Sequence, residues 1–216
     1  MSEPKPKSMI RLLLESGPTD PFLITKLNLL EELQAAHARN DHKTMLEIGQ
    51  KLAANDKAFG QARENRRAMM KKTVVQAKAT ADPDERAKKL LAAFEFCVKA
   101  ACEAKEESQD IATFNFGVKQ LGVISDELSA TPPDRFIELA QFLDSPDIRV
   151  RAFAAVWLRH IMPERILPIL KEIDKTEGFG TPAGTQVHFA ISELELEERK
   201  KQNNTARNQK EPDAKS

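Results

Sequence analysis

The stretch from Asp144 to Ile173, DSPDIRVRAFAAVWLRHIMPERILPILKEI, constrains the fold more than any other part of the chain. It contains a short turn marked by Pro146, an almost wholly apolar segment, and a second helical pattern that starts at Pro163. A helix that is apolar around most of its girth has to be covered on more than one side. A turn followed by two such helices is typical of stacked helical repeats. The sequence therefore predicts an all-α fold of stacked antiparallel helix pairs.

The apolar pattern of this stretch occurs twice, 30 residues apart. The first copy is Phe136, Leu139, Ala140 and Leu143, and the second is Ile166, Ile169, Leu170 and Ile173. The helix that would complete each copy also matches, although at a spacing of 36 residues: Phe153, Ala154 and Leu158 correspond to Phe189, Ala190 and Leu194. From these stripes we predict that Phe153, Trp157, Leu158 and Leu170 lie in the core.

The longer spacing places an insertion within Glu177 to Thr185, EGFGTPAGT. Insertions in helical repeats are confined to loops on one face, and that face is often the binding face. We therefore include Phe179 and Thr181 in a candidate binding surface. A phosphate cradle made by the glycines of this loop is the less favoured alternative to an ordinary inter-helix loop.

Helix start signals divide the rest of the chain. Asp20-Pro21 and Asp82-Pro83 each put an acidic cap before a proline at the first helical position, where the missing N–H costs nothing. We expect a flexible arm over 1–18, a helical extension over 19–81, a repeat domain over 82–199 and a disordered tail over 200–216. Thr131-Pro132-Pro133 should end one helix and start another.

Basic residues gather in the second half of the extension. Between Lys57 and Lys72 there are six of them against the single acid Glu64. The candidate contacts for an acidic partner or a phosphate backbone are Arg63, Arg66, Arg67, Lys71 and Lys72. A solvated helix face is the alternative interpretation. The acids Glu103, Glu106, Glu107 and Asp110, and those at the end of the last helix, are either intramolecular counterparts or a site for a basic partner.

The segment DSPDIRVRAFAAVWL resembles a HEAT repeat, in its Asp-x-Pro-Asp turn, its Val150-Arg151 pair and the apolar helix that follows. In such a unit the arginine after the turn is structural, which implies that Arg151 pairs with Asp144 or Asp147. We place the neighbouring Arg149 on the candidate binding surface.

More widely, residues from about 87 to 198 resemble a small bacterial all-helical family catalogued as domain of unknown function two-thousand-nineteen. The resemblance is carried by ATFNFGVKQL, LAQFLDSPDIRVRAFAA and MPERILPILKEI. Members usually close with a Leu-x-x-Trp-like ending, whereas this chain reads ISELELEE. The family brings no catalytic residues, and small HEAT-like bacterial proteins include immunity partners of toxins.

Composition excludes several classes of function. Lys and Arg together number 33, as do Asp and Glu, so no general attraction draws the chain to nucleic acid or to an anionic membrane. No apolar run is long enough for a membrane span or a secretory signal, which favours a cytoplasmic protein. Cys97 and Cys102 are interpreted as small core residues. The four histidines show no metal-binding spacing, and we find no catalytic nucleophile or paired acid.

We therefore expect a non-enzymatic, protein-binding helical module without cofactor or metal. An immunity protein or an adaptor is the most concrete version. The alternative is nucleic-acid binding through the basic helix over 57–72.

Overall fold

The computed structural model describes residues 9, 10, 14, 20–131 and 134–210, and the side chains of this part as far as 202. All regular elements in these residues are helical, which confirms the predicted all-α class. In chain order they are α2 (Pro21–Ala38), α3 (His42–Lys78), α4 (Pro83–Ser108), α5 (Ile111–Ala130), the 3-10 helix η1 (Phe136–Asp144), α6 (Ile148–Leu158), α7 (Pro163–Glu177) and α8 (Pro182–Lys210). The predicted arm over 1–18 falls almost wholly outside the described residues.

Aspartate caps five successive α-helices. In each case the carboxylate accepts a hydrogen bond from a backbone N–H of the first turn, which otherwise has no partner. The caps are Asp20, Asp41, Asp82, Asp110 and Asp147. The two predicted starts at Asp20-Pro21 and Asp82-Pro83 are confirmed, with the Asp82 carboxylate 2.8 Å from the amide of Glu85.

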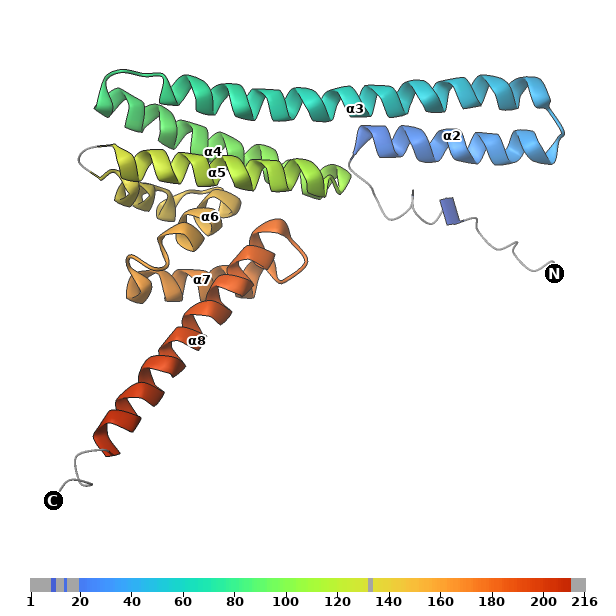
Figure 1. Cartoon of the computed structure of the whole chain (residues 1–216). Helices are drawn as coiled ribbons and strands as arrows, with labels where there is room; N and C mark the ends of the chain where they lie inside the picture. Colours follow the sequence, from blue (N-terminus) through green and yellow to red (C-terminus); the bar gives the residue numbers. More distant parts are fainter. Residues whose placement is uncertain (1–8, 11–13, 15–19, 132–133, 211–216) are drawn as a thin grey trace.

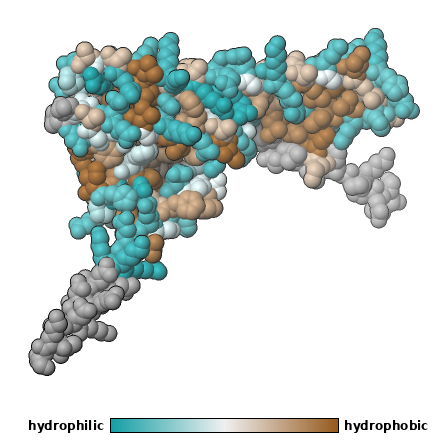
Figure 2. Space-filling model, viewed as in Figure 1, coloured by the Kyte–Doolittle hydropathy of each residue, from teal (hydrophilic) through white to brown (hydrophobic). Residues whose placement is uncertain are grey.

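The long helix α3 belongs to two parts of the molecule. Its first half pairs with α2 in a hairpin that has a small core of its own, made by Leu29, Ala36 and Ile48. Its second half lies on α4 and α5 and contributes Met70, Val74 and Ala77 to the main core. Figure 1 shows α3 running along both parts, and Figure 2 shows apolar surface over the hairpin. The main core therefore extends across the boundary that we placed between residues 81 and 82.

The main core is built by α4, α5, η1, α6, α7 and α8, and the second half of α3 packs on α4 and α5 at one edge of it. Of the predicted core residues, Phe153, Leu158 and Leu170 are buried, while Trp157 is partly buried and packs against the core. Cys97 and Cys102 are both free and buried, and burial raises the pKa of each thiol to about 12.

The two copies of the apolar repeat form different helices. We predicted a helix after Thr131-Pro132-Pro133, and the element there is the 3-10 helix η1, in which residues three apart lie in line. η1 buries Phe136, Leu139 and Leu143, and α7 buries Ile166, Leu170 and Ile173, so both helices bury residues spaced three and four apart. The same 0, 3, 4, 7 pattern fits either helix, so the pattern alone could not distinguish them. Pro132 and Pro133 lie outside the described residues.

We expected a disordered tail from residue 200, whereas α8 continues to Lys210 in the structure (Figure 1). The first part of α8 packs on α6 and α7, and a helix that is already nucleated extends at little cost even through polar residues. The remainder of the predicted tail lies outside the described residues. Within the described ranges, no helix combines the length and the apolar character needed to cross a membrane.

Candidate binding surface at the turn between α7 and α8

The turn from Gly178 to Thr181 joins α7 to α8, and hydrogen bonds within it and to the first residues of α8 hold its backbone. Gly178 has a φ of 67°, in the left-handed region that favours glycine. The hydroxyl oxygen of Thr181 accepts a hydrogen bond from the amide of Gly184 at 2.9 Å. The hydroxyl of Thr185 lies 2.7 Å from the carbonyl oxygen of Phe179 and 2.8 Å from that of Thr181, and it shares its single proton between them. On the other side, the amide of Gly178 donates to the carbonyl oxygen of Asp174 at 3.1 Å, so hydrogen bonds hold the backbone both before and after Phe179.

Gly184 makes this turn tight. A Cβ atom at this position would lie 1.7 Å from the carbonyl oxygen of Gly178, so any side chain would force the turn open. Gly184 lies inside α8, because the helix starts at Pro182. The predicted insertion over 177–185 therefore forms a short turn and the first residues of a helix, and it is not a long loop.

The turn presents a cluster of exposed aromatic rings, which we call the aromatic cluster: Phe179, His188 and Phe189. Phe179 is 57% exposed and Phe189 is 59% exposed. Their ring centroids are 6.0 Å apart, and both rings meet His188 edge to face, at 5.2 Å from Phe179 and 6.4 Å from Phe189. Figure 2 shows apolar surface at the end of the body where α7 turns into α8.

The imidazole of His188 is also tied to α7. Its Nδ1 atom lies 3.5 Å from a carboxylate oxygen of Asp174. The aromatic cluster is thus attached to both helices of the pair, and its two phenylalanines have little to cover them among the described residues.

Sequence reasoning found one half of this surface and missed the other. Phe179 is exposed as predicted, whereas Thr181 is half-buried and its side chain caps α8. Phe189, which the repeat aligns with Phe153, was not among the candidate binding residues, yet it is exposed whereas Phe153 is buried. The buried stripe of α8 is Ala183, Val187, Ala190 and Leu194, whose spacing of 4, 3 and 4 leaves Phe189 on a neighbouring face. The spacing of these apolar residues in the sequence could have identified the buried face of this helix and placed Phe189 outside it.

The arginines of the predicted basic surface are largely engaged within the chain. Arg63 donates two hydrogen bonds of 2.7 Å to the two carboxylate oxygens of Asp110. Arg67 donates to the hydroxyl of Thr113 at 2.9 Å, and Arg66 lies 3.5 Å from a carboxylate oxygen of Glu107. These contacts attach α3 to the turn between α4 and α5.

Asp110 is the centre of that attachment, since its side chain is only 2% exposed and also caps α5. Burial by itself would raise the pKa of Asp110. Hydrogen bonds from Thr113 and Arg63, together with the charge of Arg63, outweigh burial and hold the pKa below its ordinary value. The acids of this turn are therefore intramolecular counterparts of the basic helix. Lys57, Lys71 and Lys72 remain exposed.

We expected Arg151 to pair with Asp144 or Asp147, but it is Arg149 that pairs with Asp147. Arg149 donates to the carboxylate of Asp147 at 2.9 and 3.1 Å and reaches Glu106 on α4 at 3.3 Å. The hydrogen bond with Asp147 is the main cause that raises the pKa of the Arg149 guanidinium. Arg149 thus ties the start of α6 to α4, which leaves little of its side chain for a partner.

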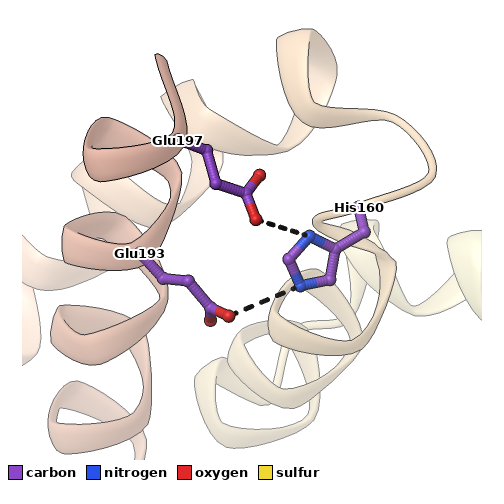
Figure 3. A group of neighbouring side chains, drawn as sticks. All are labelled: His160, Glu193 and Glu197. Carbon is purple, nitrogen blue, oxygen red and sulfur yellow. Dashed lines mark ion pairs between the residues drawn. The ribbon is translucent and has the colours of Figure 1, made fainter. Parts of the chain in front are cut away.

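A second group of chemically active side chains lies where α8 passes the end of α6. It consists of His160, Glu193 and Glu197, which face one another in Figure 3. The Nε2 atom of His160 is 3.8 Å from Glu193, and its Nδ1 atom is 3.8 Å from Glu197. One potential ligand atom from each residue lies within 4.8 Å of the others, so these are the described residues that could hold a metal ion.

No family model matches the chain, and no curated protein or solved structure is similar to it.

Proposed function

We propose that this chain is a non-enzymatic protein-binding module whose contact surface is the aromatic cluster at the turn between α7 and α8. The observation that supports the proposal most directly is the combination of exposure and rigidity in Phe179. More than half of its side chain is exposed, yet hydrogen bonds on both sides hold its backbone. An exposed phenylalanine adds little to the stability of the fold, so its fixed position calls for another reason.

Binding supplies such a reason. Aromatic side chains dominate the energetic centres of protein interfaces, and burial of one phenylalanine contributes roughly 1.5 to 3 kcal/mol. A side chain that is already held in place loses less conformational freedom when a partner binds. Phe179 and Phe189 together offer two such anchors, separated by one ring contact. The partner that fits is a protein with an apolar pocket or groove.

The resemblance to HEAT repeats suggests the biological form of this binding, because small HEAT-like bacterial proteins include immunity partners of toxins. An immunity protein or an adaptor acts by occupying a surface of another protein, with no chemistry of its own. A rigid pair of aromatic anchors on a helical scaffold is suited to that task.

Nucleic-acid binding through the basic helix is supported less well. Three of its five candidate residues, Arg63, Arg66 and Arg67, face acids or hydroxyls of the same chain. The exposed lysines that remain offer a smaller positive surface than the sequence predicts.

The proposal is tested by replacing the two anchors together, in the variant Phe179→Ala/Phe189→Ala. A photo-crosslinking residue at position 179 in the otherwise native chain identifies the partner from cells of the source organism. The affinity of the purified partner is then measured for the native chain and for the double variant. We expect the double variant to bind the partner at least about 30-fold more weakly, because the loss of an anchor that contributes about 2 kcal/mol changes the dissociation constant by that factor.

The matched control is Val75→Ala, which removes an exposed apolar side chain from α3, far from the turn in the chain. It should bind the partner as the native chain does. Circular dichroism should show equal helicity in all three proteins, since both phenylalanines are more than half exposed. A partner that binds the double variant as tightly as the native chain would refute the proposal, as would a crosslinker at position 179 that captures nothing in stoichiometric amount.

A further inference from the structure

The group formed by His160, Glu193 and Glu197 has the ligand types of a metal site. Imidazole nitrogen and carboxylate oxygen are the ligands that Zn²⁺ accepts alongside thiolate. Glu193 and Glu197 are four residues apart on α8, so they project from the same face of the helix on consecutive turns. His160 reaches them from the turn that follows α6. The sequence did not predict the group, because His160 and the two glutamates are far apart in the chain.

The separations within the group suit an ion better than direct hydrogen bonds. The two contacts of the imidazole with the carboxylates are both 3.8 Å long, beyond the range of a hydrogen bond. Bonds from zinc to nitrogen and oxygen are about 2.0 to 2.2 Å long, which puts neighbouring ligands of a tetrahedral site about 3.3 to 3.6 Å apart. The ligand atoms of the group lie within 4.8 Å of one another, so they would have to close by up to about 1.5 Å to reach that distance. Only one ring nitrogen can bind the same ion as both carboxylates, so the ring turns as the ion binds.

The charges around the group favour a cation. The hollow beside the group, of about 310 Å³, is lined by Glu164, Glu197 and Glu198 and by the cations Arg159 and Lys201. With Glu193, the carboxylates outnumber these two cations by two. A divalent ion would balance that excess.

Arg159 holds one of the ligands in place. Its guanidinium donates to one carboxylate oxygen of Glu193 at 2.8 and 3.1 Å, and it is itself fixed by a hydrogen bond of 2.6 Å to the carbonyl oxygen of Val156. The other carboxylate oxygen of Glu193 is the one that faces His160. Outer partners that orient a ligand in this way are a regular part of metal sites.

We propose that His160, Glu193 and Glu197 form a binding site for a divalent transition-metal ion of the zinc class. Three protein ligands leave a fourth position for water or for a group from a partner. The ion joins α8 to the end of α6, in addition to the hydrogen bonds that Arg159 makes between them. The site is separate from the aromatic cluster, so it does not depend on the proposed function.

The test is isothermal titration of the full-length chain, freed of metal, with Zn²⁺. The native chain should bind one ion per chain, and the ion should raise its thermal unfolding temperature, because a ligand that binds only the folded state stabilises it. Each of His160→Gln, Glu193→Gln and Glu197→Gln should weaken binding at least about tenfold, the effect expected when a group that a metal site depends on is lost.

Two controls separate this site from other ways of holding a cation. Glu198→Gln removes a carboxylate that lines the same hollow but lies outside the group, and it should bind Zn²⁺ as the native chain does. His188→Gln removes the imidazole that pairs with Asp174, a His–carboxylate contact between α8 and α7, and should also leave Zn²⁺ binding unchanged. Circular dichroism establishes that every variant folds.

Three results would overturn the proposal. They are absence of saturable Zn²⁺ binding by the native chain, undiminished binding in the three ligand variants, and equal affinity for Mg²⁺. The last result would mean that the carboxylates attract any dication and that the imidazole is not a ligand.

Discussion

Gly117 lies where α5 packs tightly against Ala101 of α4, and its replacement by alanine tests this packing. A Cβ atom at position 117 would lie 2.5 Å from the Cβ atom of Ala101 and 3.3 Å from the sulfur of Met70. Carbon atoms in contact are normally about 3.5 to 4.0 Å apart, so the two helices would have to separate by roughly 1 Å or more. Ala101 and Met70 are both fully buried, so neither can move into solvent.

The expected effect is a balance of two opposing contributions. Alanine is favoured over glycine in a helix by about 1 kcal/mol. Overpacking of a well-packed core costs about 1 to 3 kcal/mol, and a contact against a neighbouring helix's Cβ belongs at the upper end of that range. We therefore expect Gly117→Ala to lower the free energy of unfolding by about 2 kcal/mol.

Gly122 supplies a matched control on the same helix. A Cβ atom there would have its nearest neighbour, a ring carbon of Trp157, at 3.8 Å, which is an ordinary contact. Gly122→Ala should therefore stabilise the protein by about 0.5 to 1 kcal/mol. Urea unfolding followed by circular dichroism measures both free energies. If Gly117→Ala proved as stable as the native chain, the close packing of α4 on α5 described above would be wrong.

Two further predictions concern the ion pairs made by Asp110 and by Arg149. The pKa of Asp110 is depressed in the folded state, so its charge contributes stability above the unfolded-state pKa of about 3.9, and that contribution is lost as the pH falls through the lower folded value. Asp110→Asn should thus be less stable than the native chain at pH 7. Urea unfolding at a series of pH values should show that the difference in unfolding free energy between the two proteins shrinks below about pH 4. A difference that stays constant with pH would contradict the stabilising role of the Asp110 charge. Arg149→Ala should lower the free energy of unfolding by about 1 kcal/mol, because it removes partly exposed bonds to two carboxylates, whereas Arg151→Ala should change it by less than about 0.5 kcal/mol. Equal losses in the two variants would mean that Arg149 has no special role at the start of α6.

The candidate surface shows where prediction from the sequence stops. Phe179 could be predicted to be exposed, because the glycines around it mark a turn and turns lie at the surface. Phe189 could not be placed by aligning it with Phe153, because the two helices are covered to different extents. Ala190 and Leu194 are buried like their counterparts Ala154 and Leu158, but α6 is also covered on the face of Phe153, whereas α8 leaves Phe189 59% exposed.

The sequence by itself determined the features that depend on neighbours within one or two helical turns. Asp20 and Asp82 cap the helices that they were predicted to start, and Leu158 and Leu170 lie in the core, because caps and apolar stripes are local patterns. Only the tertiary structure decided which charges meet. Arg63 pairs with Asp110, and His160 lies beside Glu193, because the packing of whole helices brings these residues within a few ångströms of each other. Such distances depend on helix crossing and length, which local patterns along the chain do not specify.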